Sequence, residues 1–183
     1  YEFSFACSLP RRLYVKKGST GLQDGSSWRN AIPELGIALQ IANQCSEVEE
    51  IWVSNDVFEK ALLDSLSQAY DLSKFGIDRV GATFKLPSGL KLYGGFKGDE
   101  SSIEERTAGQ YTTLKGNSQG LIFPFYSSQL LLARRTSSNG TLDGFSLEEA
   151  DGIALYEAGI EEPHSYLNIN NCQFKHNDYT LTS

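Results

Sequence analysis

Four carboxylates lie close together in the last third of the chain, at Asp143, Glu148, Glu149 and Asp151. Hydrolysis of a glycosidic bond needs two carboxylates that face one sugar linkage. These four residues are therefore the catalytic candidates of the chain. No motif places a partner acid for any of them, and acidic residues on turns are commonly solvated. The sequence favours the solvated alternative, so we assign no catalytic set.

Two other groups of residues carry chemistry in principle. Lyase chemistry needs a basic residue and carboxylates that hold calcium, and Arg134-Arg135 with Asp143 is the only hint of it. The segment Glu161-Glu-Pro-His164 could bind a divalent metal, but its spacing matches no metal signature. We expect no metal and no other cofactor.

Aromatic side chains offer a different kind of site, because their faces can stack on sugars. The cluster Phe123, Phe125 and Tyr126 is the most exposed aromatic group that the sequence predicts, and it is our candidate ligand-contact surface. Trp52 lies in an apolar stretch, and we expect it in the core. We expect Trp28 to anchor a loop against a helix, since large aromatics mainly contribute buried area.

The composition is that of a globular protein with one domain-sized core. The 183 residues are 40% hydrophobic and 21% charged, with a formal net charge of −7 and a pI near 4.9. An acidic chain is a poor partner for nucleic acid, since phosphate binding needs clustered Lys and Arg. No apolar run is long enough to span a bilayer.

Three cysteines leave several alternatives open. The first eleven residues are expected to be a tail or the remnant of a signal, with Cys7 as a lipidated residue, or else an ordinary first strand. Cys7 and Cys45 would pair if the protein is secreted, although sequence cannot determine connectivity. Cys172 falls at a core-facing position and is expected to be a small buried hydrophobe.

Short strands with alternating apolar residues dominate the chain, with Gly-rich and Ser-rich turns between them. A helix is predicted at 33–43, because its apolar residues form one stripe and Pro33 suits a first helical turn. That apolar stripe must be covered, and the open end of a coil of strands would cover it. A second helical pattern at 59–80 is expected to be an insertion. Strands are expected at 12–16, 50–54, 83–86, 90–93, 111–115, 129–134, 141–147, 152–156 and 167–174.

A weak internal repeat relates two of these strands. The segments 142–147 and 169–174 align without gaps, and alternation puts their matched apolar residues on one face. Asn170 and Asn171 suit a corner between strands, since Asn tolerates left-handed backbone. We expect parallel strands whose apolar positions all point inward in stacked rows. The matched pairs are Leu142 with Ile169, Phe145 with Cys172, and Leu147 with Phe174.

The order of these motifs resembles a known family. Leu13-Tyr-Val, Asp24-Gly-Ser-Ser-Trp28, the helix and Glu50-Ile-Trp-Val53 resemble the N-terminal cap of bacterial right-handed parallel β-helix surface proteins of the pectin-lyase-like superfamily. The later motifs resemble the rungs that follow such a cap. They are Leu92-Tyr-Gly-Gly-Phe-Lys-Gly98, Arg106, Leu142-Asp-Gly-Phe145, Asn171-Cys-Gln-Phe174 and Asn177.

The resemblance implies an all-β fold: a right-handed parallel β-helix with an N-terminal capping α-helix and one helical insertion. The expected domain spans 12–183, with a cap at 12–58, the insertion at 59–80 and rungs at 81–183. The segment 59–80 and the end of the preceding strand, Asn55-Asp-Val-Phe58, depart from the family pattern.

Members of this branch are typically adhesins or other surface proteins, so the resemblance implies a non-catalytic secreted or cell-surface module that binds glycans or proteins. The first alternative is a polysaccharide lyase or glycoside hydrolase acting on acidic polysaccharide. The second alternative is a structural subunit that stacks on a partner chain. The C-terminal end is expected to be covered by further rungs or a partner, because terminal repeats normally carry a cap.

Overall fold

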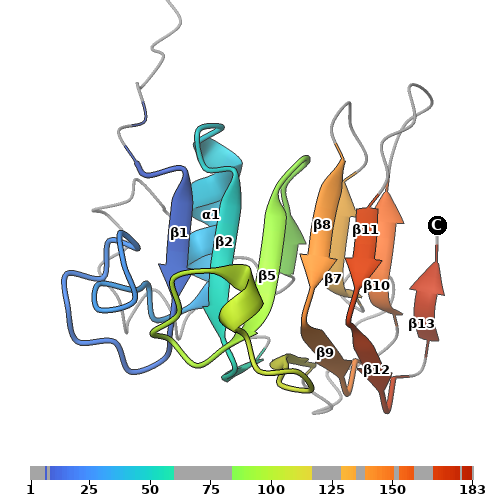
Figure 1. Cartoon of the computed structure of the whole chain (residues 1–183). Coiled ribbons are helices and arrows are strands. Elements are labelled where there is room, and N and C mark those ends of the chain that lie inside the picture. The colour runs from blue at the N-terminus through green and yellow to red at the C-terminus, as the bar shows by residue number, and fades with distance from the viewer. Residues whose placement is uncertain are drawn as a thin grey trace, which may run out of the picture.

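Strands make up most of the fold in the computed structural model (Figure 1), which describes residues 7, 9–59, 84–116, 129–134, 139–150, 153–158, 167–177 and 179–182. These strands form three sheets, and every pair of neighbouring strands within them is parallel. From β2 onward each sheet takes every third strand of the chain, so consecutive strands lie in different sheets.

The three sheets have a simple strand order. The first contains, in order, β1 (Arg12–Val15), β2 (Glu50–Ser54), β5 (Lys91–Phe96), β8 (Gly140–Asp143) and β11 (Leu167–Asn170). The second contains β3 (Val57–Glu59), β6 (Thr112–Lys115), β9 (Phe145–Glu148) and β12 (Gln173–Lys175). The third contains β4 (Phe84–Leu86), β7 (Gln129–Arg134), β10 (Ile153–Ala158) and β13 (Tyr179–Thr182).

One row of apolar side chains from each sheet forms the common core. Since strand side chains alternate in direction, in-register parallel pairing stacks the apolar residues of successive strands on one another. The expectation of parallel strands is therefore confirmed. The rows are Leu13, Ile51, Leu92, Leu142 and Ile169 in the first sheet, Phe58, Leu114, Leu147 and Phe174 in the second, and Phe84, Leu131 and Leu155 in the third.

Helix α1 (Leu35–Gln44) covers the N-terminal end of this core. It lies behind β1 and β2 in Figure 1 and contacts β4 and β1. Leu35, Leu39 and Ala42 are all buried, as predicted for the stripe of the helix at 33–43. The helix begins two residues after Pro33, and the short 3₁₀ helix η2 (Ile103–Glu105) lies much later in the chain.

The expected fold class is wrong for this structure. The expectation was an all-β right-handed parallel β-helix with an N-terminal capping α-helix and one helical insertion. The described residues instead form parallel sheets with α1 packed into the same core, a mixed α/β arrangement. The physical reason is that α1 is part of the hydrophobic core, since six of its ten residues are buried together with the strand residues. Of the expected insertion, Glu59 ends strand β3, and 60–80 lies outside the described residues.

Several strand boundaries also differ from the prediction. The single strands expected at 141–147 and 167–174 are each two strands, separated by Gly144 in one case and by Asn171 and Cys172 in the other. Alternation continues across both corners and did not reveal the one at Gly144, whereas the corner at Asn171 is the one that the Asn170-Asn171 pair predicted. The short strands β3 and β13 were missed, because three or four residues are too few to show a period.

The last strands are less buried than the strands that precede them. Leu142, Phe145 and Leu147 have no exposed surface, as predicted. Cys172 and Phe174 are only partly buried against the core, and Ile169 is 37% exposed. Ile169 and Phe174 are in register with the inward-facing Leu142 and Leu147, and Cys172 packs against the core, so the predicted stacked rows are confirmed. The last row is less buried because a terminal strand has a neighbour on one side only.

Cys7 and Cys45 form a disulfide, which settles one of the alternatives that the sequence left open. The bond ties the segment before β1 to the end of helix α1. Within the described part of the chain, no helix has the length and apolar character needed to cross a membrane.

Candidate functional site

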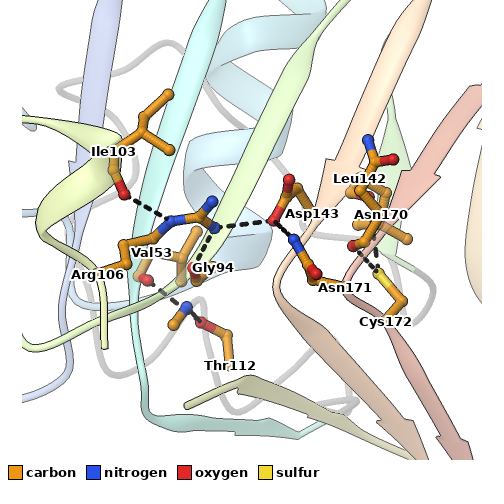
Figure 2. A network of polar contacts seen from close by, with 11 residues as sticks. Val53, Gly94, Ile103, Arg106, Thr112, Leu142, Asp143, Asn170, Asn171 and Cys172 are labelled. Carbon is orange, nitrogen blue, oxygen red and sulfur yellow. Dashed lines mark hydrogen bonds and ion pairs between the residues drawn. The ribbon is translucent and has the colours of Figure 1, made fainter. Parts of the chain in front are cut away.

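Arg106 joins three parts of the chain beside the first sheet (Figure 2). Its Nε donates to the carbonyl oxygen of Ile103 at 3.1 Å. Its Nη1 donates to the carbonyl oxygen of Gly94 at 3.0 Å and to Oδ1 of Asp143 at 2.9 Å. The guanidinium therefore links strands β5 and β8 to the loop that contains η2.

The loop at 97–111 positions Arg106, and Glu100 organises the beginning of that loop. The carboxylate of Glu100 accepts backbone N–H groups from Lys97 at 2.7 Å, Gly98 at 2.9 Å and Asp99 at 3.1 Å. Burial alone would raise the pKa of Glu100, but these donors outweigh burial and the pKa lies below its usual value. A charged Glu100 thus holds the loop in one conformation.

Trp28 attaches the same loop to the N-terminal part of the chain. Its indole nitrogen donates to the carbonyl oxygen of Glu100 at 2.9 Å, and its ring packs edge-on against Tyr14. Phe96 lies next to Trp28 and stacks on the ring of Trp52. Trp52 is buried, as predicted, and Trp28 anchors its loop through the hydrogen bond to Glu100.

Gly144, at the corner between β8 and β9, makes room for the guanidinium. Its φ is +80°, a backbone conformation that side-chain-bearing residues rarely adopt. A Cβ atom there would lie 2.6 Å from the carbonyl oxygen of Gly94 and 2.9 Å from Nη1 of Arg106. The Asp143-Gly144 pair thus supplies both the partner of Arg106 and the space for it.

Asp143 ends strand β8 and points outward, since Leu142 before it faces the core. Its Oδ1 accepts from Arg106 and also from Nδ2 of Asn171 at 3.3 Å. The side chains of Arg106 and Asp143 are only 16% and 13% exposed. The two charges are therefore balanced and largely withdrawn from water.

Arg106, Asp143 and Asn171 line a hollow on the surface. Its volume is about 210 Å³. The loop 103–111 supplies most of the wall, and the corners after β8 and β11 supply the rest. The lining residues are Ile103, Arg106, Thr107, Ala108, Gly109, Gln110, Tyr111, Asp143, Gly144 and Asn171.

Tyr93 lies next to this site on the same outward face. It is the in-register neighbour of Asp143 on β5, and the guanidinium carbon of Arg106 is 5.8 Å from the centre of its ring. Burial, followed by the charges of Glu50 and Asp143, raises the pKa of Tyr93. Its phenol therefore stays protonated and able to donate a hydrogen bond.

Asn171 occupies the corner that the sequence predicted for it, with φ of +46°. The next residue, Cys172, directs its thiol to the carbonyl oxygens of Asn170 at 3.1 Å and Leu142 at 3.6 Å. Burial raises the pKa of Cys172, so its thiol stays protonated. Cys172 packs against the core of the sheets.

Three of the four candidate carboxylates are described, and these three do not gather in one place. Of the described three, only Asp143 lines the hollow. Glu148 accepts from the Ser146 hydroxyl at 2.6 Å and pairs with Lys175, and that hydroxyl has the largest effect in lowering the pKa of Glu148. Glu149 pairs with Lys115 at 3.2 Å, and Asp151 lies outside the described residues.

The remaining predicted sites cannot be placed. Phe123, Phe125 and Tyr126 lie outside the described residues, as do Arg135 and the segment 161–164. Among the residues that the structure does describe, no three His, Cys, Asp or Glu side chains lie together as metal ligands.

Sequence reasoning missed Arg106 as a site residue, although it named this residue as part of a family motif. Its partner Asp143 is 37 positions away in sequence, and no local pattern joins the two. The available signal was a lone Arg directly after an acidic turn, about ten residues after a Gly-Gly-Phe strand end.

Comparisons with protein-family models, with curated proteins and with solved structures found no significant match to this chain. The site must therefore be interpreted from its own geometry.

Proposed function

We propose that the chain is a non-catalytic module of a secreted or cell-surface protein that binds a glycan in the hollow at Arg106, Asp143 and Asn171. The observation that carries the proposal is the hollow itself, in which a balanced ion pair and two amides, from Gln110 and Asn171, line a concave surface. Sites for small ligands typically combine a concavity with a few fixed polar groups. Sugar hydroxyls both donate and accept, so they need both kinds of partner.

The enzyme alternative has less support from the same residues. Glycoside hydrolysis uses two carboxylates about 5–9.5 Å apart across the scissile bond. Among the described lining residues only Asp143 carries a carboxylate, and Arg106 and Asn171 already engage it. Glu148 and Glu149 pair with lysines instead.

The disulfide between Cys7 and Cys45 supports a secreted or cell-surface location. Disulfides form and persist in oxidising compartments and are rare in reducing ones. This argument is independent of the hollow.

A glycan array with the whole chain tests the binding function. The matched variants are Ala108→Trp, which fills the hollow from its exposed wall, and Ser101→Trp, an equally exposed position outside the lining. We expect array binding that Ala108→Trp abolishes and Ser101→Trp retains. No bound glycan, or equal binding by both variants, would reject the proposal for this site.

A second candidate, assembly through the last strands, rests on the exposure of Ile169. Strands β11, β12 and β13 each end their sheet within the described residues, so their outer backbone groups have no strand partner there. Two residues of β11 carry amides, Asn168 and Asn170. An amide both donates and accepts hydrogen bonds, so the same edge on two chains can pair with itself. Because amides are uncharged, they add no repulsion between two chains that each have a net charge of −7.

We propose that a second copy of the chain covers this edge, so that two chains meet at their last strands. The N-terminal end is a poorer surface for this contact, because α1 and a backbone pairing between Val15 and Ile32 already occupy it. Light scattering across a concentration series should show a dimer. A monomer at every concentration would reject this candidate and leave the glycan proposal intact.

A further inference from the structure

The bonding of Arg106 and Asp143 leaves one donor group and one acceptor atom of this pair unused. Nε and Nη1 of Arg106 are both engaged, and Oδ1 of Asp143 accepts from two donors. Among the described residues, no hydrogen bond involves Nη2 of Arg106 or Oδ2 of Asp143, and neither atom carries a dashed line in Figure 2. Both residues line the hollow. Although the two side chains are only 16% and 13% exposed, neither of these atoms is sealed from solvent, so both are available to a ligand in the hollow.

We infer that the hollow takes a neutral sugar through two adjacent hydroxyl groups, an inference that rests on the proposed glycan-binding function. One hydroxyl accepts from Nη2 of Arg106, and its neighbour on the ring donates to Oδ2 of Asp143. Two neighbouring hydroxyl groups on a sugar ring can accept one hydrogen bond and donate another at adjacent positions. They therefore match Nη2 of Arg106, a donor, and Oδ2 of Asp143, an acceptor, which the ion pair holds next to each other.

The charges of the site argue for a neutral ligand over an acidic one. Asp143 already balances the charge of Arg106 at 2.9 Å, so the pair presents no net positive charge to a carboxylate. The unused oxygen of Asp143 would repel a carboxylate at close range. The net charge of the whole chain, −7, adds to this repulsion.

The size of the hollow limits what enters it. Its volume of about 210 Å³ lies below the range of about 300–1,000 Å³ that is common for drug-sized ligands. One sugar ring is therefore the unit that fits. Ile103 and Ala108 supply apolar wall, and Tyr111 supplies an aromatic side chain for the less polar face of a ring.

The test compares three kinds of probe on the whole chain by titration calorimetry. They are the neutral oligosaccharide that binds best on an array, the same oligosaccharide with its terminal hexose oxidised to a uronic acid, and deoxy analogues that lack one ring hydroxyl each. We expect the uronate to bind at least about tenfold more weakly. Removing either hydroxyl of one vicinal pair should weaken binding by about tenfold or more. The reason is that either the guanidinium of Arg106 or the carboxylate of Asp143 then loses its hydrogen-bond partner.

The variant Asp143→Asn separates recognition from folding. It keeps the shape of the side chain but removes its charge, so Arg106 becomes a net cation. Affinity for the neutral probe should fall while affinity for the uronate rises, a reversal that a purely structural role of Asp143 would not produce. If this variant does not fold by circular dichroism, the deoxy series on the unmodified chain decides the question.

Different outcomes reject different claims. A preference of the unmodified chain for the uronate, or deoxy analogues that all bind as tightly as the parent sugar, would overturn the inference while glycan binding stands. The absence of any glycan binding would overturn both the inference and the proposed function.

Discussion

Leu142 and Ile169 are in-register neighbours on the paired strands β8 and β11, yet Leu142 is fully buried and Ile169 is 37% exposed. The other members of their row, Leu13, Ile51 and Leu92, have no exposed surface. The change in exposure falls at the last strand of the sheet, so it marks the edge of the structure and not a difference in residue type.

The substitutions Leu142→Asp and Ile169→Asp should therefore differ in their effect. A charge at Leu142 has no partner in the core and should cost about 4 kcal/mol or more of unfolding free energy. At a dilution where the chain is monomeric, Ile169→Asp should cost less than about 1 kcal/mol. Urea unfolding measures both values. At high concentration, light scattering of Ile169→Asp should show the dimer lost, and a persisting dimer would contradict assembly through β11.

Glu100→Gln should lower stability near neutral pH by about 1–3 kcal/mol, because the backbone N–H groups of Lys97, Gly98 and Asp99 lose a charged acceptor. The folded pKa of Glu100 lies below its unfolded value, about 4.3. Its stabilisation is therefore complete above the unfolded pKa and is lost as pH falls through the folded pKa.

The measurement is urea unfolding of both proteins between pH 7 and about pH 3, across the ordinary pKa of Glu. The difference in unfolding free energy between the unmodified chain and Glu100→Gln should become smaller as the pH falls. Glu47→Gln, at an exposed position, is the control. A difference that stays constant across this range would contradict the role given to Glu100.

Leu39→Asp should destabilise the protein by about 3–5 kcal/mol, since Leu39 lies on the buried face of α1. Asn43→Asp, on the exposed side of the same helix, controls for helix propensity and net charge. The melting temperature in a thermal scan is the readout. Equal melting temperatures for the two variants would show that α1 does not share the core of the sheets.

Cys45→Ser should cost about 3–4 kcal/mol, because the disulfide with Cys7 closes a loop of sequence separation 38. Thermal scans with and without reductant should differ for the unmodified chain and coincide for the variant. Peptide mapping without reduction should recover the Cys7–Cys45 pair. A lipid-modified Cys7 in the native protein would contradict this pairing.

Local pattern determined much of the secondary structure. The strands at 50–54 and 129–134 have the bounds expected from short apolar runs between polar residues, and the helix follows from its apolar stripe. The inward positions of Leu142, Phe145 and Leu147 also follow from a period of two. These properties are determined by residues near one another in sequence, so the sequence is sufficient for them.

Corners, pairing and the candidate site depended on tertiary structure. Gly144 breaks one expected strand into two because its backbone must let Arg106 reach Gly94 and Asp143. The 37 residues between Arg106 and Asp143 are brought together only when β5 and β8 pair in register. Cys7 and Cys45 likewise meet through the packing of α1.

What the sequence by itself determined is the inward direction of apolar residues such as Leu142, Phe145 and Leu147 and the buried stripe of α1, because these depend on the local period. What only the tertiary structure decided is the class of the fold, the exposure of Ile169 and the hollow at Arg106. Each of these depends on which strands become neighbours, and neighbours in space are separated here by tens of residues in sequence.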